Sequence, residues 1–233
     1  MKTFKLSPLV LCILLLAGCG PKLITKGDAY PGHYREAPLS ILVLPAINES
    51  TAADAKDFYS TTVAEPLAFA GYYVFPLEVV TEILKKEGLA DTETLMNVPQ
   101  KKFKEYFGAD AVLYVKILKW DTFYFVIGGN VTVGIECELK STTTGDLIWR
   151  YNGSLTLDTT AEDRNVGSPI ASLIVKLVET AVKTAVTDYV PIAKRVNYMV
   201  TSSMPFGKYH KLHGKDQGLN VLEDKVKPKE QKK

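Results

Sequence analysis

The order of hydrophobic and polar positions predicts a sheet whose two halves are built differently. Residues 40–44 form a short continuous apolar run, which is typical of a strand covered on both faces. Further apolar runs and stretches of helical spacing predict strands over 72–75 and 109–118 and helices over 54–70, 77–87 and 99–107. Pro66 should kink or interrupt the first helix. The first half therefore has the order β-α-β-α-α-β of a layered α/β sheet.

The second half alternates between apolar and polar residues instead. Three consecutive strands are predicted over 123–127, 131–139 and 147–157, with turns at Gly128-Gly129-Asn130 and at Thr143-Thr144-Gly145-Asp146. In the middle strand, Cys137 shares one face with valine, isoleucine and leucine, while Glu136 and Glu138 lie on the other. An antiparallel meander follows, with Cys137 in the core and the two glutamates toward solvent.

The longest helical pattern covers residues 169–190, with Ser168 as its cap and Pro169 as its first residue. Its apolar face is broad, so the helix packs on the sheet or also meets a second copy or a membrane surface. Pro191 is expected to end it. The predicted fold is mixed α/β (α+β), with a mixed β-sheet, an antiparallel meander and a C-terminal amphipathic helix on the sheet.

The amino terminus has the three parts of a bacterial lipoprotein signal. A short basic segment, residues 1–5, contains Lys2 and Lys5 and precedes an apolar run. The run is shorter than the roughly 20 residues of a membrane span and ends in Leu16-Ala17-Gly18-Cys19. Small side chains at Ala17 and Gly18 suit a peptidase cleft, and the Cys19 thiol can form a thioether to a diacylglyceryl group. We expect signal-peptidase recognition at this lipobox and lipidation of Cys19. The alternatives are an ordinary signal peptide with an incidental cysteine, or an uncleaved anchor.

Four segments are predicted: a signal peptide at 1–18, a lipidated tether at 19–38, one α/β domain at 39–207 and a polar, lysine-rich tail at 208–233. The tether is inferred from its prolines and glycines and its lack of periodicity. Gly20, rather than aspartate, follows the lipidated cysteine, which favours the outer membrane, with the domain on the periplasmic side. Diacylglyceryl and palmitate chains would hold the protein there through its N-terminal lipid.

Charge and cysteine content narrow the class of partner. The 233-residue chain has 28 basic and 26 acidic residues, and removal of residues 1–18 takes away two lysines and no acid. A mature chain with balanced charge argues against nucleic-acid binding, which needs a concentrated positive patch. With Cys12 removed in the signal peptide and Cys19 lipidated, Cys137 is left alone, so no intrachain disulfide is expected.

The sequence shows no catalytic motif, and we expect no enzyme activity, cofactor, metal or catalytic residue. His33 falls in the predicted tether, while His210 and His213 form a His-x-x-His in the tail. That spacing could place two imidazoles on one metal ion, but no acid or thiol follows in a matching order. Cys137 is predicted to be a buried, inert thiol.

Four stretches together resemble a known family: Ser40–Ser50, Phe58–Leu67, Gly71–Val80 and Phe107–Tyr114. The family is an uncharacterised group of bacterial outer-membrane lipoproteins that includes a meningococcal vaccine-antigen candidate, and the resemblance runs from the lipobox to about residue 190. It implies a fold similar to the N-terminal domain of the Tol-system periplasmic protein and to the periplasmic domain of the curli-secretion lipoprotein. It also implies self-association, as a homo-oligomer, and a curli-secretion-like lipoprotein as partner, and it supplies no catalytic residues.

Two functional hypotheses follow. The first is a non-enzymatic interaction component of an envelope transport or surface-assembly complex, which binds through its sheet edge, through helix 169–190, or through both. The alternative is a lipoprotein that binds a small periplasmic ligand or a cell-wall component. Its pocket would lie near the carboxyl ends of strands 41–45 and 110–118, where open α/β sheets bind ligands.

Overall fold

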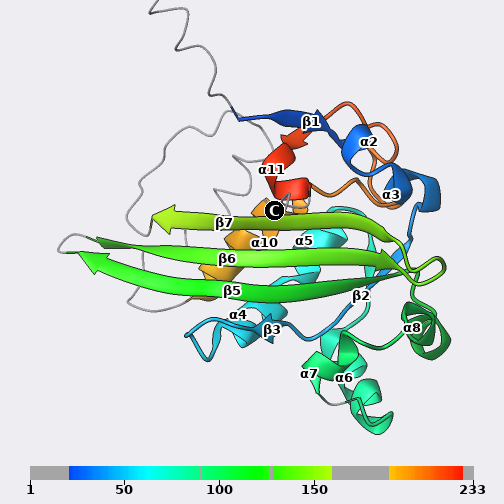
Figure 1. Ribbon diagram of the computed structural model, residues 1–233, viewed down its shortest axis with the longest axis horizontal. Coiled ribbons are helices and arrows are strands. Elements are labelled where there is room, and N and C mark those ends of the chain that lie inside the picture. The colour runs from blue at the N-terminus through cyan, green and yellow to red at the C-terminus, as the bar shows by residue number, and fades with distance from the viewer. Residues whose placement is uncertain (1–20, 90, 126–127, 159–188, 228–233) are drawn as a thin grey trace, which may run out of the picture.

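A mixed β-sheet forms the centre of the molecule (Figure 1). The computed structural model describes residues 21–89, 91–125, 128–158 and 189–227. Within them, the six strands of this sheet are β2 (Ser40–Val43), β3 (Ile47–Asn48), β4 (Tyr73–Val74), β5 (Ala111–Phe125), β6 (Gly128–Ser141) and β7 (Leu147–Asp158). The order is β4-β2-β5-β6-β7, with β3 beside β5. Pairing is parallel from β4 to β5 and antiparallel from β5 to β7, which confirms the predicted change of architecture.

Helices occupy the connections between the parallel strands. They are α4 (Ala55–Thr62), α5 (Ala64–Phe69), α6 (Leu77–Lys86), α7 (Thr92–Leu95) and α8 (Gln100–Phe107). The predicted helix over 54–70 is interrupted at Val63, because Pro66 has no N–H to bond the Thr62 carbonyl and its ring crowds that turn. Helices α6 and α8 match their predictions, whereas the single turn α7 was not predicted.

Strand β5 corrects the expected meander in two places. Residues 109–118 and 123–127, expected as separate strands, mostly belong to one continuous strand with a register shift between Ile117 and Lys119. Leu118 lies at this bulge and is 39% exposed, which explains the break in the alternating pattern. The turn expected at Gly128-Gly129-Asn130 is also misplaced, because β6 begins at Gly128 and pairs with Phe125.

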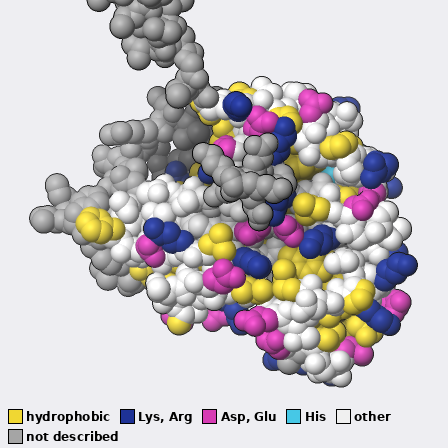
Figure 2. Space-filling model, in the orientation of Figure 1, with side chains coloured by type: hydrophobic (Ala, Val, Ile, Leu, Met, Phe, Trp, Pro, Cys, Tyr) yellow, Lys and Arg dark blue, Asp and Glu magenta, His cyan; other side chains and the backbone are white. Residues whose placement is uncertain are grey.

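Two hydrophobic clusters lie on opposite faces of the sheet. Helices α4, α5 and α10 (Val190–Thr201) cover one face, where Ile41, Leu113 and Cys137 join the larger cluster. Helices α6, α7 and α8 cover the other face only over β2 and β5, where Leu42 and Val112 are buried. Figure 2 shows acidic and basic side chains interspersed over the rest of that second face.

The helix predicted over 169–190 lies almost entirely outside the described residues, so its predicted face stays untested. The C-terminal helix that the structure describes is α10, whose buried side chains include Ala193, Val196 and Val200. Pro191 was expected to end a helix, but it lies in the first turn of α10. A proline is tolerated there because the N–H groups of the first turn have no partner within the helix.

Both segments outside the predicted domain form regular structure. The amino-terminal one contains β1 (Leu23–Thr25), α2 (Lys26–Ala29) and α3 (Pro31–Glu36), and the carboxyl-terminal one contains β8 (Asn220–Leu222) and α11 (Glu223–Val226). Strands β1 and β8 pair antiparallel as a separate two-stranded sheet, which we call the terminal ribbon. A tether and a polar tail were expected here, so the two ends contribute more to the fold than their sequences suggested.

Candidate functional site at the amino-terminal segment

The predicted lipidation site lies in residues 1–20, outside the described part of the chain. Leu16, Ala17, Gly18 and Cys19 therefore remain predictions, and the structure instead describes how the chain directly after them is held. Strand β1 begins at Leu23, four positions after Cys19. Among the described residues, no helix has both the length and the apolar character that crossing a bilayer requires. The attachment of the amino-terminal segment is therefore the geometry that bears on anchoring.

The terminal ribbon places two leucines next to each other on its outer side. Leu23 pairs directly with Leu222, and their side chains are 56% and 40% exposed. The next pair, Ile24 and Val221, points the opposite way and packs against the larger core cluster. The ribbon is thus attached to the fold by one face and presents an apolar pair on the other.

A buried lysine follows β1 directly. The Lys26 ammonium, with its side chain 3% exposed, donates to the Met204 carbonyl oxygen at 2.5 Å and lies 3.7 Å from the Asp216 carboxylate. The Asp216 carboxylate also accepts the backbone N–H of Phe206 at 2.8 Å. Burial lowers the pKa of Lys26, and the charge of Asp216 opposes that change. This contact fixes the amino-terminal segment to the chain after α10.

His33 makes a second link between the same two parts of the chain. Tyr72 donates its hydroxyl proton to the Pro205 carbonyl at 2.6 Å, and His33 Nε2 lies 2.8 Å from the same hydroxyl oxygen. Because that proton is already used, His33 Nε2 is the protonated nitrogen and donates to Tyr72. Burial lowers the pKa of His33 to about 4, so the imidazole is neutral at pH 7. The sequence analysis had placed His33 in a tether.

The two histidines of the His-x-x-His pattern serve local structure. His210 Nδ1 accepts the N–H of Leu212 at 3.1 Å, and its ring stacks on Phe206 with 3.8 Å between centroids. His213 Nδ1 donates to the Phe206 carbonyl at 2.8 Å. No group of three or more metal-ligating side chains occurs within the residues that the structure describes. The geometry gives no support to a metal site at this pair.

Cys137 is buried, as predicted. Its side chain is 1% exposed, its Sγ lies 3.7 Å from the Tyr59 hydroxyl, and burial raises its pKa to about 12. Glu136 and Glu138 lie on the other face, as predicted, but they are not open to solvent. Their side chains are 25% and 21% exposed, and Arg150 Nη2 contacts both carboxylates at 3.0 and 2.9 Å. A salt-bridged cluster therefore replaces the expected solvated pair.

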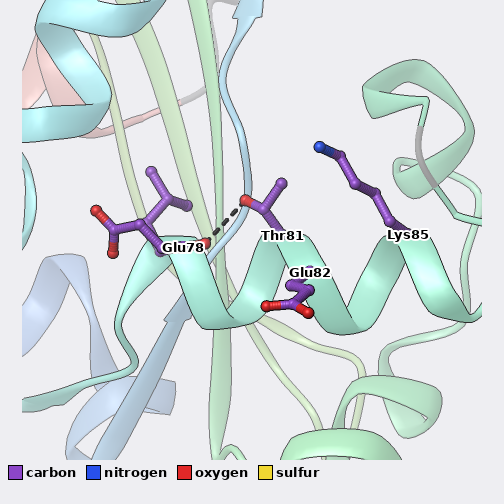
Figure 3. A pocket seen from close by; sticks show the side chains of 5 residues that line it. Glu78, Thr81, Glu82 and Lys85 are labelled. Carbon is purple, nitrogen blue, oxygen red and sulfur yellow. Dashed lines mark hydrogen bonds between the residues drawn. The ribbon is translucent and has the colours of Figure 1, made fainter.

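Two open hollows on the described surface bear differently on the pocket that the small-ligand alternative requires. Each is open and holds about 460 Å³. One runs along the single helix α6, where Figure 3 shows Glu78, Thr81, Glu82 and Lys85 and the hydrogen bond from Thr81 to the Leu77 carbonyl. The other lies directly after the predicted strand 110–118, close to the predicted pocket, and its lining includes Thr51, Lys119, Asp121 and Thr132.

The core is filled between the two predicted strands. Leu44 and Ala46 at the end of strand 41–45, and Val115 and Ile117 in strand 110–118, are at most 3% exposed. A binder of small ligands needs a cavity with converging polar groups. These side chains fill the space between the two strands, and the hollow directly after strand 110–118 keeps the small-ligand alternative as a prediction.

Comparisons with known proteins agree with the lipoprotein signal. The model of the family described as "Putative lipoprotein GNA1162-like" matches residues 29–209. The chain is 31% identical over 186 residues to "Putative lipoprotein NMB1124/NMB1162" of Neisseria meningitidis serogroup B, which covers 78% of this chain and 84% of that relative. The crystal structure of lipoprotein GNA1162 from Neisseria meningitidis aligns with a TM-score of 0.49 at 31% identity, covering 63% of this chain and 100% of that one. A PelC dodecamer structure from Paraburkholderia phytofirmans aligns with a TM-score of 0.44 at 13% identity, covering 82% and 95%.

Proposed function

Because this chain belongs to the GNA1162-like lipoprotein family, we propose that it is anchored to the outer membrane through lipid on Cys19 and faces the periplasm. There it acts as a non-enzymatic interaction component of an envelope transport or surface-assembly complex. The observation that carries the anchoring is Leu16-Ala17-Gly18-Cys19 at the end of a short apolar run in a member of a lipoprotein family. A diacylglyceryl group and a further acyl chain such as palmitate exceed the two-signal threshold for stable anchoring.

Two features support an interaction role rather than catalysis. The side chains with catalytic potential are engaged in packing: Cys137 and His33 are buried, and the Nδ1 atoms of His210 and His213 are bound to backbone groups. Strand β7 lies at the end of the strand order, and an edge strand presents backbone groups that can pair with another chain. Part of β7 is already covered by this chain, because α3 and α11 contact it and the Arg150 carbonyl accepts the Tyr30 hydroxyl, so another chain would pair with the rest of the strand. A second copy of the chain and a curli-secretion-like lipoprotein are the proposed partners.

Metabolic labelling tests the anchor. Cells that express the full chain are grown with an alkyne-bearing fatty acid, and the wild type is compared with Cys19→Ala and with Cys137→Ala as the matched control. We expect label and outer-membrane fractionation in the wild type and in Cys137→Ala, and loss of both in Cys19→Ala. Equal labelling of wild type and Cys19→Ala would refute the proposed anchor.

Crosslinking tests the interaction role. The native lipoprotein is crosslinked in intact cells, solubilised in detergent and isolated, and its products are identified by mass. Recovery of a homo-oligomer together with an envelope lipoprotein is the expected result. Recovery of the monomer alone, from cells in which Cys19 is labelled, would contradict the interaction role and leave the anchor standing.

A further inference from the structure

We propose that the terminal ribbon is a membrane-contact surface, with Leu23 and Leu222 seated in the headgroup region of an anionic bilayer. The proposal rests on the anchoring of Cys19 and adds to it an orientation of the whole domain. The family comparisons describe a lipoprotein and assign no such surface. Three observations carry it: the spacing between Cys19 and β1, the outward apolar pair, and the lysines around that pair.

The distance between the anchor and the fold is short. Leu23, the first residue of β1, lies four positions after Cys19, with three residues between them. A fully extended chain spans at most about 3.6 Å per residue, so these two Cα atoms lie within about 14 Å of each other. The polar headgroup layer of one leaflet is itself about 5–8 Å thick. A lipid on Cys19 therefore holds the ribbon at the bilayer surface rather than on a long tether.

The leucine pair of the ribbon faces outward because the opposite face of the ribbon packs against the core. Ile24 and Val221 pack against the core cluster, and Lys26, directly after β1, is bound to Met204 and Asp216. These contacts fix which side of the ribbon faces outward. The outward side carries the paired leucines, 56% and 40% exposed, at the position closest to the anchor. Apolar side chains at such a position insert about 5–10 Å into the boundary between headgroups and acyl chains.

Lysines flank the leucine pair. Lys22 precedes β1, and Lys225 and Lys227 lie in and directly after α11, which continues from β8 (Figure 1). The two acids of the same surface are each paired, Glu223 with Lys227 at 2.5 Å and Asp224 with Lys225 at 3.8 Å. Lysine stems can lie along apolar surface while their ammonium groups reach lipid phosphates. The three lysines exceed the two acids by one positive charge, and this excess favours an anionic over a neutral lipid surface.

Depth-dependent quenching tests the proposal on the lipidated full chain. Leu222→Cys is labelled with an environment-sensitive fluorophore, while the buried Cys137 stays unlabelled, and the protein is reconstituted into vesicles of phosphatidylethanolamine and phosphatidylglycerol. Val79→Cys is the matched control, because Val79 is 52% exposed on α6, at the edge opposite the ribbon in Figure 1. We expect a blue-shifted emission and several-fold stronger quenching by a lipid-bound quencher at position 222 than at 79. Equal quenching at the two positions would overturn the proposal.

A second variant separates contact from anchoring. Leu23→Asp in the Leu222→Cys background should lose most of the quenching while the protein still sediments with the vesicles, whereas Val79→Asp should change nothing. Because Leu23 is exposed, we expect its replacement to leave the fold intact. A thermal unfolding curve of each variant checks this. Retained quenching in Leu23→Asp would also overturn the proposal. The mass of the wild-type protein shows whether Cys19 carries lipid. If it carries none, the result contradicts the proposed lipid anchor rather than the membrane-contact surface.

Discussion

The ammonium group of Lys26 lies 3.7 Å from the carboxylate of Asp216, with the two side chains 3% and 0% exposed. Lys26 follows the first described strand, and Asp216 precedes the last one. Lys26 also lies over the ring of Phe206, 4.9 Å from its centroid. A buried salt bridge therefore joins the amino-terminal segment, directly after β1, to the segment that precedes β8.

Removal of one member of this pair should be costly. Lys26→Met leaves the Asp216 carboxylate buried without its counter-charge, and breaking a buried pair in this way costs about 3–5 kcal/mol. The double variant Lys26→Met/Asp216→Leu buries no uncompensated charge, so we expect it to lose less stability than Lys26→Met. Urea unfolding of the chain from residue 20 onward measures both free energies. A double variant less stable than either single one would contradict this account.

A surface pair provides the control. Lys102 and Glu105 lie 2.8 Å apart on α8, but their side chains are 50% and 58% exposed. Water and salt screen such a pair, so Lys102→Ala should cost no more than about 0.5 kcal/mol. A similar loss for Lys102→Ala and Lys26→Met would show that burial does not decide the strength of the contact.

His33 should make the fold sensitive to acid. Burial lowers its pKa from 6.5 to about 4 in the folded state, so below pH 6.5 the unfolded chain binds a proton that the folded chain does not. The stabilisation from His33 is therefore complete above pH 6.5 and is lost as the pH falls through about 4, with a total of about 3 kcal/mol. The slope of unfolding free energy against pH between 7 and 4 should be smaller in His33→Gln than in the wild type.

Tyr72→Phe is the matched control for this pH dependence. It removes the hydroxyl that accepts from His33 Nε2 and keeps the histidine and its buried position. Because the same hydroxyl also donates to the Pro205 carbonyl, the variant loses two hydrogen bonds, and we expect a loss of about 1–3 kcal/mol at pH 7 with the acid-dependent slope retained. Equal slopes in the wild type and in His33→Gln would show that another group causes the acid sensitivity.

The elements that the sequence predicted correctly are those whose pattern is local. The continuous apolar run of β2 and the alternation in β6 determine buried faces over a few residues, and the structure places Ile41 and Cys137 in the core accordingly. Pro66 and Gly108 act within one turn, and they interrupt or end helices where expected. The bulge at Leu118 escaped prediction because one inserted residue reverses the alternation on which strand boundaries depend.

The candidate site divides along the same line. The lipobox at Cys19 is a contiguous signal and is readable without structure. The ribbon depends on pairing between residues 23–25 and 220–222, and each strand is too short to show a period. Lys26 and Asp216 resembled ordinary surface charges, since nothing in their neighbouring residues shows that they meet. Only the folded arrangement shows that the Gly- and Pro-rich start and the lysine-rich end form one structure.

The close contact between Gly207 and Gly71 should leave no room for a side chain at Gly207. Gly207 packs on Gly71, and a methyl group at Gly207 would lie 2.7 Å from the Gly71 carbonyl carbon and 2.8 Å from Tyr72 Cδ1. Gly207→Ala should therefore cost about 1–3 kcal/mol through overpacking. Gly218→Ala is its control, because no atom lies within 4 Å of the added methyl group, and it should change stability by less than about 0.5 kcal/mol. Urea unfolding of both variants checks the difference, and equal stabilities would contradict the close contact.

Cys137 should react with thiol reagents only after the protein unfolds. Its side chain is 1% exposed, and burial raises its pKa to about 12, so at pH 8 only about one thiol in ten thousand is ionised. In the chain from residue 20 onward, where Cys137 is the one cysteine, an aromatic disulfide reagent should leave the native protein unmodified and should modify one thiol per chain in denaturant. Leu222→Cys, exposed on the ribbon, should add one thiol that reacts in the native state. Rapid modification of native Cys137 would instead show that its thiolate is accessible, which would contradict the assignment of Cys137 as a buried, inert thiol.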